Sequence, residues 1–166
     1  MLFRSNREGA ITTRANTVNT GGVAGLDLNG ENMIAGVWDG GLVRESHNLL
    51  EDRVLQIDNP GSISSHATHV SGTMVGSGSQ VNGQAKGMAP MAELLAYDFG
   101  ADEPEMTSAA SQGMILSNHS YGIPADNVPL WYIGYYDSNA RDIDRIVYNA
   151  PYYLPIVAAG NDRQSG

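Results

Sequence analysis

The sequence predicts a three-layer α/β fold in which a mostly parallel sheet is covered by helices on both faces. Short apolar runs alternate with helical patterns along the chain, and each run is continuously apolar instead of alternating with polar residues. A length of 166 residues, 42% of them apolar and 16% charged, is sufficient for one domain with its own core.

Five apolar runs are expected to form the strands of this sheet. They are Met33–Trp38, Arg53–Ile57, Ala92–Phe99, Met114–Ser117 and Leu154–Ala159. Glycine and proline follow several of them, as in Asp39-Gly40-Gly41, and such residues favour tight turns.

Three helices are expected between the strands. Ser64 or Ser65 is a suitable N-cap for a helix that starts near His66. Asp102-Glu103-Pro104-Glu105 opens a second helix with a capping-box pattern and an early proline. Asp137–Asn149 forms a third, with its apolar residues on one face.

The first 30 residues form a polar lead segment, rich in glycine, asparagine and threonine. A weak helix is expected within it, around Glu8–Ala15. The stretch Gly76–Gly87 is expected to be a loop, because it is rich in glycine, serine, asparagine and glutamine.

Composition excludes several classes of function. The net charge is −9 and Lys86 is the only lysine, which argues against binding to a nucleic-acid backbone. The absence of cysteine excludes disulfides, thiol nucleophiles and thiolate metal sites. No apolar run approaches the 18 residues of a membrane span, the first ten residues contain no hydrophobic signal core, and no phosphate-binding motif is present.

Polar side chains are expected to converge where the strands end. Asp39, Asp98, Asn118–Ser120 and Asn161 follow four of the predicted strands. In an open parallel sheet, ligands bind beyond the carboxyl ends of the strands. This edge is therefore where the sequence predicts a functional site.

Asp39 and His66 are the main candidates for chemistry at this edge. Asp39 could orient another side chain or bind a metal ion, or it could simply bond its own turn. His66 could act as a general base, and His69 lies three residues further along the same helix. A metal site of Asp39, His66 and His69 is the alternative, although the HExxH spacing of zinc hydrolases is absent.

Asn161 and the segment Asn118–Gly122 are the next candidates. The Asn161 amide could donate to an oxyanion, or it could be an ordinary turn residue. The backbone of Asn118–Gly122 could pair with an extended peptide, and His119 is a further candidate base, ranked below His66. Trp131, Tyr132, Tyr135 and Tyr136 are interpreted as a packed surface segment and not as a ligand cage.

Four segments resemble, in the same order, segments of the subtilisin-like serine peptidases (subtilases). Ile34–Gly41 is similar to their aspartate segment, and Ser65–Thr73 to the histidine segment usually written HGTHVAGT. Lys86–Pro90 resembles their Gly-x-Ala-Pro strand, and Val157–Asn161 resembles the segment with the oxyanion asparagine. In addition to these four, Ser117–Gly122 is similar to the stretch that lines the substrate cleft.

This resemblance implies a role for each candidate residue. Asp39 would orient His66, His66 would be the general base, and Asn161 would stabilise the tetrahedral oxyanion. Ser120, Tyr121 and Gly122 would pair with the substrate backbone. His69 would be structural, and Ala67 stands where the family usually has glycine.

The resemblance also implies that the nucleophile lies outside these residues. The family carries its serine in a Gly-Thr-Ser-Met-Ala-like segment, roughly 65 residues after the asparagine. The sequence continues for only five residues after Asn161, so residues 31–166 are expected to be the N-terminal portion of a catalytic domain. The 166 residues alone are expected to be inactive and poorly soluble. The alternative is a catalytically inactive, peptide-binding domain of the same fold.

For ligands and location the resemblance implies a polypeptide substrate and no required cofactor. Calcium is an optional ligand in the family, and residues 76–87 stand where its calcium loop often lies. No nucleic-acid or membrane partner is expected, and the sequence carries no signal for an oligomeric state. An extracellular or secreted location follows from the resemblance alone.

Overall fold

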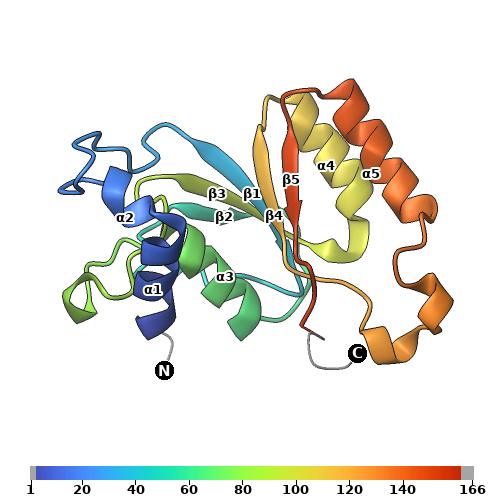
Figure 1. Cartoon of the computed structure of the whole chain (residues 1–166), viewed down its shortest axis with the longest axis horizontal. Helices are drawn as coiled ribbons and strands as arrows, with labels where there is room; N and C mark the ends of the chain where they lie inside the picture. The colour runs from blue at the N-terminus through green and yellow to red at the C-terminus, as the bar shows by residue number, and fades with distance from the viewer. Residues whose placement is uncertain (1–2, 162–166) are drawn as a thin grey trace.

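A five-stranded parallel sheet forms the centre of the computed structural model, which describes residues 3–161 (Figure 1). The strand order is β2-β3-β1-β4-β5, and every neighbouring pair is parallel. The strands are β1 (Ile34–Asp39), β2 (Val54–Gln56), β3 (Glu93–Asp98), β4 (Leu116–His119) and β5 (Leu154–Val157). The predicted α/β class with a parallel sheet is confirmed.

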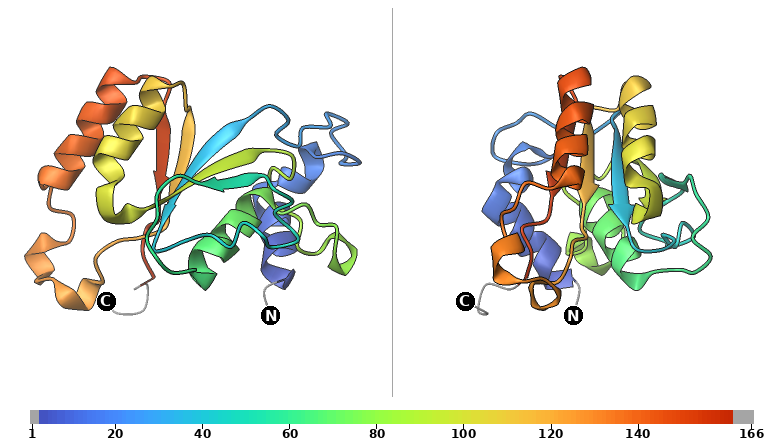
Figure 2. Two further views of the ribbon diagram at one scale, coloured as in Figure 1. Left: turned by 180° about the vertical axis from the view of Figure 1, so that it is seen from behind. Right: turned by 90° about the vertical axis from the view of Figure 1, so that its right-hand side faces the viewer.

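Helices cover both faces of the sheet, as the continuously apolar strands require. The longer ones are α1 (Phe3–Thr13), α3 (Ser65–Val75), α4 (Asp102–Ser111) and α5 (Ser138–Asn149). A short α2 (Ala15–Val18) and single turns η1 (Val81–Gly83), η2 (Phe99–Ala101), η3 (Ala125–Asn127) and η4 (Leu130–Tyr132) lie between them. Helices α4 and α5 lie on one side of the sheet, with α3 and then α1 on the other (Figures 1 and 2). Within residues 3–161 no helix is both long and apolar enough to cross a bilayer.

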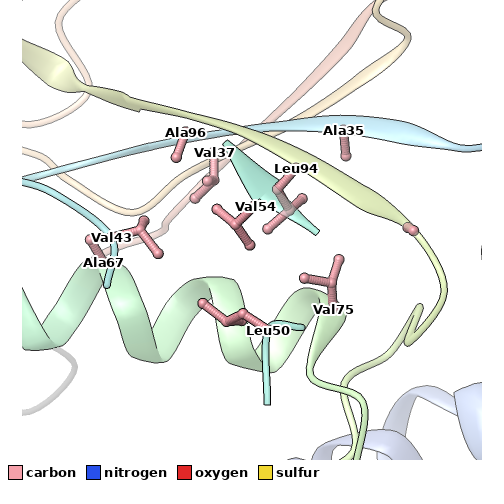
Figure 3. Close-up of a cluster of buried hydrophobic side chains, with 10 residues drawn as sticks. Ala35, Val37, Val43, Leu50, Val54, Ala67, Val75, Leu94 and Ala96 are labelled. Atoms are coloured by element: carbon pink, nitrogen blue, oxygen red, sulfur yellow. The ribbon is translucent and has the colours of Figure 1, made fainter. Parts of the chain in front are cut away.

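Two hydrophobic clusters fill the space between these layers. Alternate residues of β1 and β3 point to opposite faces, so that Val37 and Leu94 face α3 while Trp38 and Tyr97 face α4 and α5. The first cluster joins the sheet to α3 and is drawn in Figure 3. The second is closed by Met106 of α4 and by apolar residues of α5.

The order of the strands places a topological switch point between β1 and β4. The chain leaves β1 toward β2 on one side of the sheet and leaves β4 toward β5 on the other side. Connections that diverge in this way open a crevice at the carboxyl ends of the two strands, which is where doubly wound sheets bind ligands. Asp39 ends β1 and His119 ends β4, so both lie at this switch point.

The structure corrects the expected bounds of β4. The apolar run predicts Met114–Ser117, whereas the strand covers Leu116–His119. Met114 instead closes the turn after α4, with its N–H donating to Ala109. The strand continues through polar residues because both of its edges are paired, with Ser117 and His119 buried under the helices.

Two expected helix starts also differ. The lead helix covers Phe3–Thr13 instead of Glu8–Ala15 and stops at Arg14, whose φ of 62° is left-handed. Its position is fixed by packing: the Asn6 amide donates to the Gly72 and Ala85 carbonyl groups. The capping box at the start of α4 does not form, because Asp102 is already helical and accepts from the Glu103 N–H.

Candidate functional site

Asp39 is buried at the end of β1, where a tight turn fixes its carboxylate. Oδ1 of Asp39 accepts the N–H of Gly40 at 2.8 Å, and the N–H of Gly41 donates to Asp98 at 2.9 Å. Gly41 has a left-handed φ of 91°, and a Cβ there would lie 3.0 Å from the Ser62 carbonyl oxygen. Glycine is therefore required at this point, and the turn follows from the sequence Asp-Gly-Gly.

The start of α3 is tied to the same turn. Leu42 donates its N–H to Ser62, and Ser64 donates its N–H to Leu42, so the chain after β1 runs beside the chain before α3. The Ser64 hydroxyl accepts from the N–H of Ala67 at 3.1 Å and caps the helix. Together these bonds place the first turn of α3, and with it His66, beside the end of β1.

The imidazole of His66 is hydrogen-bonded to the carboxylate of Asp39. Nδ1 of His66 lies 2.7 Å from Oδ1 and 2.9 Å from Oδ2 of Asp39. The carboxylate side chain is 4% exposed and the imidazole 63% exposed. Because a carboxylate only accepts hydrogen bonds, Nδ1 carries the hydrogen, and in the neutral ring Nε2 is a free base facing solvent.

Ala67, where the resemblance implies glycine, is fully buried. Its methyl group belongs to the cluster between α3 and the sheet, together with Val43 (Figure 3). The methyl group thus points into the core and away from the solvent-facing His66 ring. Alanine in place of glycine therefore does not crowd the imidazole.

His69, three residues after His66 on α3, is not part of the His66–Asp39 pair. It lines a cleft of about 530 Å³, together with Arg44, His47 and Asn6. Among residues 3–161, no three His, Cys, Asp or Glu side chains are grouped so that they could hold a metal ion. The arrangement that the metal-hydrolase alternative requires is therefore not found in the described part of the chain.

The segment after β4 lies beside the end of β1. The N–H of Ser120 approaches the Trp38 carbonyl oxygen at 3.4 Å, and the Asn118 amide donates to the Ser120 hydroxyl at 2.8 Å. Gly122 is exposed. An extended chain could reach the backbone of this segment from solvent.

Asn161 follows β5 at the same edge of the sheet. The strand is held there by the N–H of Ala158, which donates to the His119 carbonyl oxygen at 2.9 Å. The Asn161 side chain is exposed and has no hydrogen bond to the described residues. Asp39 and His66 are thus bonded to each other, and Ser120 is bonded to Trp38, the residue before Asp39, whereas Asn161 shares only the edge.

Sequence reasoning missed a polar cluster under the sheet. Ser117, His119 and Tyr121 are spaced two residues apart, so their side chains point to the same face of β4. They are hydrogen-bonded to one another and to Tyr153 and Asp102. The sequence signal for this cluster is the alternation of polar side chains at Ser117, His119 and Tyr121, which is not apparent when strands are sought as apolar runs.

The aromatic segment near η4 lies on the surface, as interpreted from the sequence. Trp131 is 70% exposed and contacts Tyr132 and Tyr135 edge-on. The hydroxyl groups of Tyr132 and Tyr136 donate to Asp137 and Asp144.

Comparison with protein families identifies the family of this chain. The model of the subtilase family matches residues 31–166, which include every strand of the sheet and both members of the His66–Asp39 pair. No curated protein matches the chain.

Proposed function

Because the chain belongs to the subtilase family, a family of serine peptidases, we propose that it contributes two members of a catalytic triad and an oxyanion donor to a peptide-bond hydrolase. The bond that carries the proposal is the one between Nδ1 of His66 and the buried Asp39. It supplies an oriented imidazole whose other nitrogen faces solvent, which is the arrangement that serine peptidases use for proton transfer.

In the proposed reaction His66 acts as general base and then as general acid. Nε2 of His66 accepts the proton of the attacking serine hydroxyl and later gives it to the leaving amine. Asp39 stays ionised, keeps the hydrogen on Nδ1, and stabilises the imidazolium while it exists. The difference in exposure suits these roles, because the orienting carboxylate of Asp39 is shielded from solvent and the imidazole of His66 is accessible to substrate.

Asn161 is proposed to donate its amide to the oxyanion of the tetrahedral intermediate. One such donor is worth about 3–4 kcal/mol in transition-state stabilisation. The proposal is supported by the resemblance of the segment Val157–Asn161 to the oxyanion segment of the family. It is also supported by the position of this segment at the sheet edge where Asp39 ends β1. The backbone of Ser120–Gly122 is proposed to pair with the extended substrate on the opposite side of the scissile bond.

We assign the role of serine nucleophile to none of the described residues. No serine hydroxyl of residues 3–161 has a hydrogen bond to Nε2 of His66. Acyl transfer by serine, histidine and aspartate requires no cofactor. Calcium stays an optional ligand of the loop 76–87, which offers the amide oxygens of Gln80 and Asn82 but no carboxylate of its own. Secretion is proposed from the family alone.

The test is hydrolysis of an unfolded polypeptide by the natural protein that contains these residues. Asp39→Asn should lower kcat by about 10⁴-fold, because the amide stabilises the wrong tautomer of His66. His66→Ala should be similarly inactive. Glu45→Gln serves as the control, because Glu45 is exposed and the amide oxygen of glutamine can still accept the Gln56 N–H. Wild-type turnover that Asp39→Asn leaves unchanged would refute the roles of both residues.

A peptide-binding domain without catalysis is the second candidate function. It is favoured by the observation that, among the described residues, the hydrogen bonds of the His66 ring are those to Asp39, and none comes from a serine hydroxyl. In this case the natural protein would bind an extended peptide and leave it uncleaved, and a serine-directed fluorophosphonate probe would not label it.

A further inference from the structure

A continuous chain of hydrogen bonds lies between β4 and α4, separate from the His66–Asp39 pair. Tyr153 Oη is 2.6 Å from Ser117 Oγ, and Ser117 Oγ is 2.7 Å from His119 Nε2. His119 Nδ1 is 3.0 Å from Tyr121 Oη, and the Tyr121 hydroxyl donates to Asp102. Ser117, His119 and Tyr153 are all buried.

The direction of every bond in this chain can be derived from its acceptor end. The carboxylate of Asp102 only accepts, so the single hydroxyl hydrogen of Tyr121 is used on it. Tyr121 must then accept from His119, which places the ring hydrogen on Nδ1. Nε2 of the neutral ring therefore accepts from Ser117, and Ser117 in turn accepts from Tyr153. Every hydroxyl and ring N–H of this hydrogen-bond chain thus donates one hydrogen bond, and each accepting atom receives one.

Stacking holds the imidazole in this position. The ring of His119 lies 5.0 Å from the ring of Trp38 and nearly parallel to it, and Trp38 stacks on Tyr97 at 4.3 Å. The Trp38 indole N–H donates to Glu105 of α4 at 3.0 Å. A rotation of His119 would break two hydrogen bonds and this stack together.

The surroundings keep His119 neutral at physiological pH. Burial lowers the pKa of His119 to about 4, and the charge of Asp102 opposes this effect only in part. The other titratable groups around it are Tyr97, Tyr121 and Tyr153, with Glu105 further along α4; burial raises the pKa of each of these four groups. The imidazole and the three tyrosines are therefore neutral, and the hydrogen-bond chain ends on the carboxylate of Asp102.

The chain ends on the segment proposed to bind substrate. Tyr121 lies between Ser120 and Gly122, and its side chain is directed inward to Asp102 and His119, with its ring 5.1 Å from the ring of Phe99. Its side chain is therefore an anchor and not a ligand for substrate. The Ser120 N–H contact with Trp38 is the second attachment of this segment.

We propose that His119 and Tyr121 are positioning residues for the proposed peptidase: the Nδ1–H tautomer of His119 holds the Tyr121 hydroxyl, and thereby keeps the Ser120–Gly122 backbone in register for pairing with an extended polypeptide. This inference rests on the proposed function, since it assigns the substrate edge of the same site. It predicts an effect that depends on the length of the substrate.

The test compares Tyr121→Phe with Tyr136→Phe in the natural protein. Both changes remove a tyrosine–aspartate hydrogen bond, but Tyr136 bonds Asp144 on the surface. For a peptide substrate that spans several residues, Tyr121→Phe should raise KM about tenfold, as expected for the loss of a bond to a charged group. For a single-residue ester it should leave KM unchanged, and Tyr136→Phe should change neither value.

A purely structural role would lower the activity on both substrates equally, and that result would overturn the proposal. A wild-type KM of Tyr121→Phe for the peptide substrate would also overturn it. Asp102→Ala, at a half-buried position, should reproduce the KM effect if Tyr121→Phe does not fold. If wild-type protein cleaves neither substrate, the proposed function fails and the substrate role fails with it.

Nuclear magnetic resonance tests the hydrogen-bond chain without activity. Long-range ¹H–¹⁵N correlation should show His119 as the Nδ1–H tautomer in the wild type and a mixture of tautomers in Tyr121→Phe. Amide exchange at Tyr121 and Gly122 should be faster in that variant than in Tyr136→Phe. An Nε2–H tautomer in the wild type would overturn the proposal.

Discussion

Ser71 and Ser117 both have fully buried side chains, yet only the hydroxyl group of Ser117 has hydrogen-bond partners. Ser71 lies on the face of α3 that packs against the sheet, one turn after Ala67 and one turn before Val75. A buried hydroxyl without a partner loses its hydrogen bonds to water on folding and regains none. The same residue type therefore has opposite effects on stability at the two positions.

Ser71→Ala should stabilise the protein by about 1 kcal/mol, because it removes an unpaired polar atom from the core. Ser117→Ala is the matched variant and should destabilise it by about 2 kcal/mol, since it leaves His119 and Tyr153 unpaired. Urea unfolding of the two variants measures both values. A loss of stability in Ser71→Ala would show that its hydroxyl has a partner.

Most of the fold could be predicted because its strands are apolar on both faces. All five predicted strands exist, and all their bounds lie within two residues of those expected. β4 departs most, by two residues at both ends, since Ser117 and His119 occupy inward positions where an apolar residue is expected. Their polarity is tolerated only because tertiary neighbours satisfy it, and a single sequence does not show which neighbours those are.

The predicted site rests on motifs, and the structure adds contacts that motifs do not contain. The pairing of Asp39 with His66 follows from a strand end and a helix start, both of which can be recognised in sequence. The inward anchor at Tyr121 depends on Asp102, which the sequence suggested only as part of a helix cap. Long-range side-chain pairs of this kind require the fold.

The N-cap of α3 gives a second prediction. The Ser64 hydroxyl accepts from the N–H of Ala67, whereas Ser65 is exposed and has no hydrogen bond from its hydroxyl among the described residues. Ser64→Ala should destabilise the protein by about 1 kcal/mol. Ser65→Ala should change the stability by less than about 0.5 kcal/mol. Equal unfolding midpoints for the two variants would contradict the assignment of Ser64 as the cap.

Two glycines near α3 should respond oppositely to alanine. A Cβ at Gly87 would lie 2.5 Å from the backbone nitrogen of Gly76 and 2.8 Å from the Met74 carbonyl oxygen, so the backbone would have to move. Gly87→Ala should therefore destabilise the protein by about 2 kcal/mol. Gly72, inside α3, has open space at its Cβ, so Gly72→Ala should stabilise it by about 0.5–1 kcal/mol. Thermal unfolding measures both changes, and a stabilised Gly87→Ala would refute the predicted close contact.

The buried His119 should make stability depend on pH in a defined window. Its pKa is about 4 in the folded protein, against 6.5 for an ordinary histidine, mainly because of burial. Between these values the unfolded chain binds more protons than the folded one, so protonation favours unfolding and stability falls as the pH is lowered. The stabilisation from the neutral ring is complete above pH 6.5 and should fall by about 3 kcal/mol by pH 4.

Urea unfolding between pH 7 and pH 4 measures this contribution as the difference between wild type and His119→Phe. The phenyl ring can keep the stack on Trp38 but cannot take up a proton, so the variant should lose less stability than the wild type over this range. The carboxylates titrate in both proteins and cancel in the comparison. Parallel curves for wild type and His119→Phe would contradict the prediction, because they would mean that folding does not lower the pKa of His119.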